Sequence, residues 1–247
     1  MAQWTTKEMM AVALARQIND GMTCIIGTGL PLTGASLAKN TTAPNALLIF
    51  ESGMIDGNPL ELPTSVSDLR IARNASALWP QYRYFGFQGN SRKKNKIDLG
   101  FLGGAQIDPY GNLNSTSIGD YMHPKSRFTG SGGANGIATN VNTVIIMQHQ
   151  KRRFCEKVDY VTSVGWGDGP DGRKKLGLPE VGPQVVVTEL GIMRFDEATR
   201  RIYLAEYFPG ISIEQIMENT GFEMDTSRAV EAEPPSDEIL AVLKRLM

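Results

Sequence analysis

The sequence predicts an α/β protein with an open, mostly parallel sheet flanked by helices. Three apolar runs, Met22–Ile26, Leu47–Phe50 and Asn142–Met147, have the length of buried strands, and the first two end in turns that contain glycine. In the last third of the chain, segments in which apolar and polar residues alternate are separated by short turns, which is typical of an antiparallel meander at a sheet edge. The meander strands are expected at Gln184–Thr188, Ile192–Phe195 and Arg201–Ala205.

Helix signals surround these strands. Thr5 and Glu8 have the spacing of a capping box, and Gly21 is a natural helix terminator. Further helices are expected to begin near Gly34, Ser212 and Ser236, the one from Ser212 ending at Asn219. Shorter elements are expected as well: strands at Tyr84–Phe87, Leu99–Gly104 and Asp159–Val164, a helical turn at Ser65–Arg70, and a hairpin turn at Asp108–Asn112. A single domain over residues 1–247 is the simplest organisation.

Composition excludes several classes of protein. The 247 residues carry 25 basic and 26 acidic side chains, and this net charge of −1 gives no electrostatic reason to expect nucleic acid or a membrane surface as partner. No segment approaches the roughly 20 apolar residues that span a bilayer, and the N-terminus has no apolar signal region. Cys24 and Cys155 lie far apart without metal-ligand spacing, which indicates a reducing, cytoplasmic location.

Other polar motifs carry only weak chemical signals. His123 and His149 have no partner at ligand spacing, so we expect ordinary hydrogen-bonded histidines and no metal site. The acidic Gly165–Gly172 loop lacks the spacing of an EF-hand. The Gly27–Gly29 turn lacks the third glycine of a dinucleotide fingerprint, and an anion-binding turn and a packing turn both remain open. The basic run Ser91–Lys94 is a surface turn or a phosphate contact.

The stretch Leu47–Gly57, LLIFESGMIDG, contains the first candidate for chemistry. Its apolar run stops at Glu51, and an unpaired carboxylate at the end of a buried strand is energetically unfavourable. Gly53 follows closely, so the backbone can turn and be approached there. In open α/β sheets, reactive groups collect at the carboxyl ends of strands. Glu51 is therefore a candidate catalytic residue, and the structural alternative is a carboxylate that caps a turn or pairs with an arginine.

A second candidate is the glycine-rich run Phe128–Ala138, FTGSGGANGIA. Its backbone can lie close against a ligand, and a helix is expected just beyond it. The apolar residues Phe128 and Ile137 favour a packed segment over a flexible surface loop. We expect it to cradle a ligand oxygen.

A carboxylate and backbone N–H donors, without a histidine base or a metal cluster, favour nucleophilic acyl transfer. Glutamate can attack an acyl-thioester, and its extra methylene relative to aspartate extends its reach. Backbone N–H groups would stabilise the developing oxyanion, by about 2.7–4 kcal/mol for each donor.

The chain closely resembles, nearly end to end, the beta subunits of class I CoA-transferases of the glutaconate type, which use a glutamate nucleophile. The stretches that carry the resemblance are GTGLPLTGAS, ESG, FLGGAQIDPYGNLNSTSIGDY, HPKSRFTGSGGANGIAT, QHQKRRF and ENTGFEMD. The resemblance implies an open α/β sheet and a ping-pong transfer of CoA between an acyl-CoA and a small carboxylic acid, with a dicarboxylate such as glutaconate expected. No cofactor is expected, because the CoA thioester is itself a substrate.

The resemblance also implies roles for individual residues. Glu51 stands at the position of the family's catalytic glutamate, which carries the CoA as a glutamyl-CoA thioester. An oxyanion or CoA-binding role is expected for Gly53, Gly132, Gly133, Ala134 and Asn135. A homologous alpha subunit is the expected partner, with the active site at the contact between the two chains in a hetero-oligomer.

Two other functions stay open at this point. An acyl-CoA hydrolase or decarboxylase can be built on the same scaffold, but such relatives characteristically lack the nucleophilic glutamate. A non-catalytic binding subunit would be expected to have lost the ESG stretch or the GSGGAN segment, and both are present.

Overall fold

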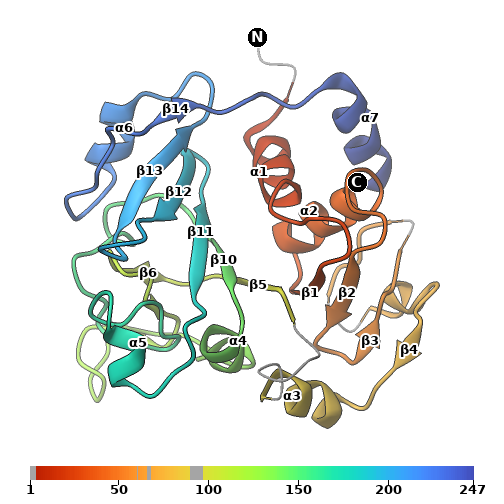
Figure 1. Cartoon of the computed structure of the whole chain (residues 1–247), viewed down its shortest axis with the longest axis horizontal. Helices are drawn as coiled ribbons and strands as arrows, with labels where there is room; N and C mark the ends of the chain where they lie inside the picture. The colour runs from red at the N-terminus through yellow and green to blue at the C-terminus, as the bar shows by residue number, and fades with distance from the viewer. Residues whose placement is uncertain (1–3, 60, 66–67, 90–96) are drawn as a thin grey trace. The chain divides into compact units, whose positions relative to one another are not determined.

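The computed structural model describes residues 4–59, 61–65, 68–89 and 97–247, which divide into two compact units (Figure 1). The first unit comprises Met1–Phe101 and Pro234–Met247, and the second comprises Leu102–Glu233. The expectation of a single domain over residues 1–247 stays a prediction. The basic run Ser91–Lys94 lies outside the described residues.

The first unit is built on strands in the order β5-β1-β2-β3-β4. The pairs β1–β2 and β1–β5 are parallel, whereas β2–β3 and β3–β4 are antiparallel. Its elements are α1 (Thr6–Ala15), β1 (Thr23–Ile26), α2 (Leu30–Lys39), β2 (Leu47–Phe50), β3 (Met54–Ile55), the 3₁₀ helix η1 (Leu69–Ala72), β4 (Ala77–Leu78), α3 (Gln81–Gly89), β5 (Leu99–Leu102) and α7 (Asp237–Leu246).

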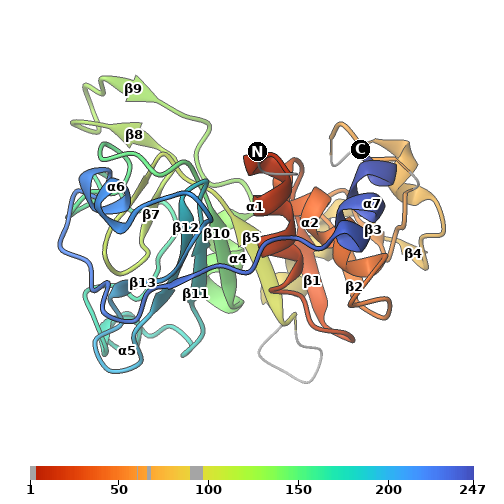
Figure 2. The same cartoon turned by 90° about the horizontal axis from the view of Figure 1, so that it is seen from above.

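Three helices pack together in this unit, with α7 beside α1 and α2 (Figure 2). The capping box of α1 is confirmed, since the Thr5 side chain accepts from the Glu8 N–H and the Glu8 carboxylate accepts from the Thr5 N–H. The predicted start of α2 near Gly34 is wrong, because α2 begins at Leu30. Gly34 instead lies inside α2 against α1, where an added Cβ would come within 2.7 Å of Leu14 Cβ. This glycine permits close helix packing.

The predicted strand at Tyr84–Phe87 is also wrong, because these residues belong to the helix α3. Aromatic residues favour strands in general, but Pro80 directly precedes the first helical residue and suits a helix start. Burial follows the helix as well, since Tyr84 is buried while Tyr82 is exposed. The predicted turn at Ser65–Arg70 corresponds in part to η1, which Asp68 caps by accepting from the Arg70 N–H.

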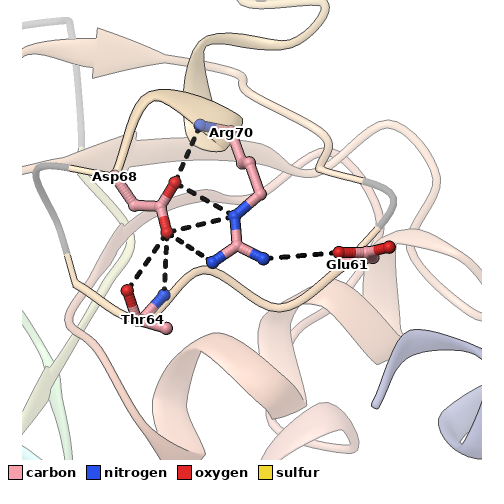
Figure 3. A network of polar contacts seen from close by, with 4 residues as sticks. All are labelled: Glu61, Thr64, Asp68 and Arg70. Atoms are coloured by element: carbon pink, nitrogen blue, oxygen red, sulfur yellow. Dashed lines mark hydrogen bonds and ion pairs between the residues drawn. The ribbon is translucent and has the colours of Figure 1, made fainter.

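The connection between β3 and β4 contains a polar network (Figure 3). The Arg70 guanidinium contacts both carboxylate oxygens of Asp68, at 2.6 Å for the closest pair, and reaches Glu61 at 3.4 Å. The Thr64 N–H and hydroxyl donate to the same Asp68 carboxylate. The hydrogen bonds from Arg70 lower the pKa of Asp68 well below its usual range. The network thus joins residues of the same connection to one another.

The second unit holds strands in the order β14-β13-β12-β11-β10. The pair β10–β11 is parallel, β11–β12 and β12–β13 are antiparallel, and β13–β14 is parallel. Its elements are β6 (Gln106–Ile107), β7 (Leu113–Asn114), β8 (Ser117–Ile118), β9 (Ser126–Arg127), α4 (Ala134–Asn140), β10 (Thr143–Ile146), α5 (Gly172–Lys175), β11 (Pro183–Val187), β12 (Gly191–Phe195), β13 (Ile202–Tyr207), α6 (Ile213–Glu218) and β14 (Val230–Glu231).

Most local predictions for the second unit are confirmed. The hairpin turn at Asp108–Asn112 joins the antiparallel strands β6 and β7, and α6 begins after Ser212 as its N-cap. In the first unit, the helix expected from Ser236 is confirmed as α7, with Ser236 as its N-cap. The predicted strand at Asp159–Val164 is wrong, since only Ser163 forms a bridge, to Leu113. Its neighbours Tyr160 and Val161 are exposed and bury no strand face.

The predicted α/β fold class is confirmed. Parallel strands in each unit are accompanied by helices, and β11, β12 and β13 form the antiparallel meander toward the C-terminus. The meander does not end the sheet, because the short strand β14 pairs with β13 beyond it. The core of the meander is apolar, with Val186, Met193 and Leu204 fully buried.

His149 is an uncharged core residue, in line with the expectation of an ordinary hydrogen-bonded histidine. Its Nε2 lies 2.9 Å from Thr220 Oγ1, its Nδ1 lies 3.2 Å from Thr188 Oγ1, and its ring stacks on Phe154. Burial lowers the pKa of His149 to about 4. The folded chain therefore disfavours the protonated imidazole.

This burial predicts a loss of stability in mild acid. The unfolded chain binds a proton at His149 near pH 6.5, whereas the folded chain does so only near pH 4. The contribution of His149 to the free energy of unfolding should therefore fall by an amount on the order of 3 kcal/mol as pH drops from 6.5 to 4. Denaturant unfolding at several pH values measures this slope. His149→Gln should flatten it, whereas His123→Gln, at the 92% exposed histidine, should not.

Candidate active site

Glu51 follows the last residue of β2, at the carboxyl end of a parallel pair. The register aligns Ile26 of β1 with Phe50 of β2, so Glu51 and the Gly27–Gly29 turn leave the sheet at the same edge. β2 then reverses into β3, with Ile49 opposite Ile55. The predicted strand end is confirmed, and Glu51 lies in a tight turn between two strands.

The turn after Glu51 depends on close backbone contact at Gly53. The Gly53 N–H donates to Phe50 O at 2.8 Å, and its carbonyl accepts from the Trp79 N–H at 2.7 Å. Gly53 has φ +90°, and an added Cβ would lie 1.8 Å from Trp79 O. Only glycine is compatible with both constraints. The geometry thus gives Gly53 a part in shaping the turn, while its oxyanion or CoA-binding role stays a prediction.

A salt bridge holds the far end of the hairpin. Asp56 adopts φ +60°, and its carboxylate lies 2.6 Å from Lys39 Nζ at the end of α2. The same ammonium donates to Ala46 O at 2.8 Å. Lys39 and Asp56 were not predicted, although the Asp56–Gly57 dipeptide after an apolar pair is a turn signal. Both ends of the Leu47–Gly57 stretch are therefore fixed.

The Glu51 carboxylate itself does not hold the turn together. It is partly buried, and among the described residues no hydrogen bond or ion pair engages it. The structural alternative required a cap or an arginine partner, and neither is found within this part of the chain. The neighbouring Ser52 hydroxyl is buried and likewise has no partner among the described residues. The carboxyl end of β2 thus carries a carboxylate and a hydroxyl that make no hydrogen bond or ion pair with the described residues.

The Gly27–Gly29 turn leaves open space at the same edge. An added Cβ at Gly27 or Gly29 would meet nothing within 4 Å, so tight packing does not explain these glycines. Gly29 has φ +77° and is the N-cap of α2, where it provides no side-chain cap. Backbone conformation accounts for Gly29, and the anion-binding alternative for this turn stays a prediction.

In the second unit, the glycine loop (Gly130–Gly133) leads into α4. Gly130 has φ +85° and Gly132 has φ +49°, and an added Cβ at either would meet nothing within 4 Å. Glycine is therefore needed here for backbone conformation, and one side of the loop is open. The predicted helix beyond the glycines is confirmed as α4.

The backbone donors of this loop differ in their availability. The Ala134 N–H donates to Ser131 O at 2.9 Å, whereas no hydrogen bond within the described ranges engages the N–H groups of Gly132 and Gly133. The Asn135 side chain accepts from Thr139 Oγ1 at 3.3 Å. The structure thus brings Gly132, Gly133, Ala134 and Asn135 together in the second unit, and Glu51 and Gly53 together in the first.

The second unit also contains a cavity of about 750 Å³ that sequence reasoning did not predict. Arg228 lies in its lining, stacked 3.7 Å from the Tyr203 ring and paired with Asp196 at 3.1 Å and Asp225 at 3.2 Å. The guanidinium charge of Arg228 is therefore balanced by two carboxylates, and we identify no candidate catalytic group in this cavity.

The described residues contain neither a metal cluster nor a membrane span. No group of three or more His, Cys, Asp or Glu side chains in this part of the chain is arranged to hold a metal ion. Among the helices of the described ranges, none has the length and apolar character needed to cross a bilayer. The expectations of no metal and no cofactor stay predictions.

Comparison with known proteins defines the class. The family described as coenzyme A transferase matches residues 7–219. The chain is 57% identical over 244 residues to the B subunit of glutaconate CoA-transferase of Acidaminococcus fermentans, covering 98% of this chain and 91% of the relative. It is 41% identical over 250 residues to the B subunit of 3-oxoadipate CoA-transferase of Pseudomonas knackmussii, covering 100% and 94%.

A solved structure agrees with these sequences. The crystal structure of glutaconate coenzyme A-transferase from Acidaminococcus fermentans superposes with a TM-score of 0.95 at 56% identity, covering 99% of this chain and 95% of that one. The chain belongs to the coenzyme A transferase family. Within it, the similarity is to B subunits, so the expectations of a CoA-transferase and of a beta-type subunit are confirmed.

The turn geometry predicts a strong effect at Gly53. Gly53→Ala introduces a Cβ within 1.8 Å of Trp79 O at a left-handed φ, so the turn must move. We expect a loss of about 1–3 kcal/mol or more in the free energy of unfolding, measured by denaturant titration. Gly27→Ala, where nothing lies within 4 Å and φ is not left-handed, is the control and should lose little.

Proposed function

We propose that this chain is the subunit that carries the catalytic glutamate of a CoA-transferase acting on a small dicarboxylic acid such as glutaconate. The observation that carries the proposal is the Glu51 carboxylate at the carboxyl end of β2, partly buried and engaged by no described residue. The names of the relatives support the substrate class, since one acts on glutaconate and another on 3-oxoadipate.

In the proposed reaction, a Glu51 oxygen attacks the thioester carbonyl of the donor acyl-CoA and expels CoA thiolate, which gives a mixed anhydride. The thiolate then attacks the glutamyl carbonyl of the anhydride, releases the donor acid and forms a glutamyl-CoA thioester. The acceptor carboxylate enters by the reverse of these steps. The thioester bond energy passes from acid to acid, so no ATP and no resident cofactor is needed.

We assign oxyanion stabilisation to the N–H groups of the glycine loop. Gly132 and Gly133 have N–H groups that no described residue engages, and the loop is open on one side. Each such donor contributes about 2.7–4 kcal/mol to an oxyanion transition state. Ala134 and Asn135, whose own bonds lie within the segment, would support CoA binding and the shape of the loop. Gly53 would act by shaping the turn that carries Glu51.

A homologous alpha subunit is the proposed partner. The relatives are named as B subunits, which supports a two-chain enzyme. We place the active site at the contact between the two chains in a hetero-oligomer, with no role for nucleic acid or membrane. Both cysteines are free thiols, which suits the cytoplasm that we propose as the location.

Removing the nucleophile tests this function. Glu51→Ala in the co-expressed two-chain complex should abolish CoA transfer from acetyl-CoA to glutaconate while the complex still assembles, because the carboxylate makes no contact that the described fold uses. Glu61→Ala, at an exposed glutamate of the same unit, is the control and should keep full activity. Full transfer by the Glu51 variant would remove Glu51 from the role.

The covalent intermediate gives a second test. The complex mixed with acetyl-CoA and no acceptor should carry CoA on the peptide that contains Glu51, located by mass spectrometry, and transfer should follow ping-pong kinetics. Label on the partner subunit alone would contradict the assignment. Release of free CoA and acid, without transfer to an added dicarboxylate, would instead identify a hydrolase.

A further inference from the structure

We propose that Arg173 is a positioning residue for the glycine loop, because its buried guanidinium binds the last carbonyls of α4, the helix that follows the loop. Its effect on catalysis rests on the proposed function of the loop. The Gly165–Gly172 segment, which carries no metal-ligand spacing, leads directly into this arginine.

The guanidinium of Arg173 is enclosed by backbone oxygens. The residue is 1% exposed, and its Nη1 donates to Ala138 O at 3.1 Å while Nη2 donates to Thr139 O at 2.7 Å. Nη1 also donates to Gly165 O at 2.9 Å, and Nε donates to Pro179 O at 2.7 Å. One side chain thus joins α4 to two other segments.

The bonds to α4 satisfy a specific need of the helix. The last four carbonyls of an α-helix have no partner within the helix, and a cation near that end interacts favourably with the helix dipole. Ala138 and Thr139 supply two of these carbonyls. Because α4 has only seven residues, fixing its last turn also limits the movement of its first turn, where Gly133 is the N-cap.

The segment that delivers Arg173 is itself fixed by close backbone contacts. An added Cβ at Gly172 would lie 2.2 Å from Trp166 O, and one at Gly165 would lie 2.4 Å from Tyr110 O. Asn112 holds the same segment, since its Nδ2 donates to Gly167 O at 2.8 Å and its Oδ1 accepts from the Gly165 N–H at 2.8 Å. The arginine therefore extends from a rigid part of the second unit.

The other end of the glycine loop is anchored separately. The Gly130 N–H donates to Ser115 O at 3.0 Å, and Ser115 Oγ donates to Gly130 O at 3.2 Å. The Ser115 N–H in turn donates to Thr162 Oγ1 at 2.9 Å. Ser115 thus holds the start of the loop and Arg173 holds the helix beyond it. The N–H groups of Gly132 and Gly133, which no described residue engages, lie between these two anchors.

Arg173→Lys is the informative variant. Lysine keeps the charge and most of the volume, but one ammonium cannot reproduce the planar fork that reaches three segments. In the two-chain complex, we expect faster hydrogen exchange over residues 128–141. At saturating acetyl-CoA, the rate of thioester formation at each Glu51 site that can be labelled should fall by about 10- to 100-fold.

Counting labelled sites separates positioning from folding, because unfolded molecules take up no label. Lys175→Met is the matched control, since Lys175 is exposed and contacts Asp168 at 3.2 Å, and it should leave both readouts unchanged. Arg173→Gln is the neutral companion and should slow thioester formation at least as much as Arg173→Lys does.

Wild-type exchange over residues 128–141 in Arg173→Lys would overturn the proposal, and so would faster exchange with an unchanged rate for each labelled site. Failure of the proposed function has a different result, since the wild-type complex would then acquire no label at Glu51. The exchange measurement would still decide in that case whether Arg173 holds the loop.

Discussion

The close approach of two backbone segments at Gly53 decides where the candidate nucleophile lies. Trp79 and Gly53 are joined by a 2.7 Å hydrogen bond, and no side chain fits between them. Gly57 shows the same constraint four residues later, where an added Cβ would lie 1.8 Å from Ile71 O. The residue that follows β4 thus lies against the turn between β2 and β3, and η1 lies against the start of the β3–β4 connection. The direction of the chain after Glu51 follows from the first of these contacts.

The second unit fixes its glycine loop by a different physical means. Main-chain oxygens there are satisfied by side chains from distant parts of the sequence, above all by the guanidinium of Arg173. A buried cation with several carbonyl acceptors is stable only while those bonds persist, because leaving a buried charge unpaired is strongly unfavourable. In each unit, the polar groups that no described residue engages therefore lie on a turn or loop whose position is fixed by contacts with residues distant in sequence.

Local sequence signals predicted the elements that local physics controls. The capping box at Thr5, the helix start at Ser236 and the apolar run before Glu51 describe interactions between neighbours in sequence, and the structure has them. The helix α3 was missed because its aromatic residues favour strands when considered alone, whereas its start follows Pro80. Arg173 could not be recognised as buried, since its acceptors lie up to 35 residues away and are backbone atoms, which leave no trace in residue types.

The separation between Glu51 and the bonds that hold its turn has an evolutionary consequence. Selection for stability acts on the glycines and on the Lys39–Asp56 pair, because these determine whether the hairpin forms. A substitution at position 51 breaks none of these bonds, since the Glu51 carboxylate engages none of the described residues. The side chain of the candidate residue can therefore change without breaking a bond of the described fold, so the same framework could carry a different group at this strand end.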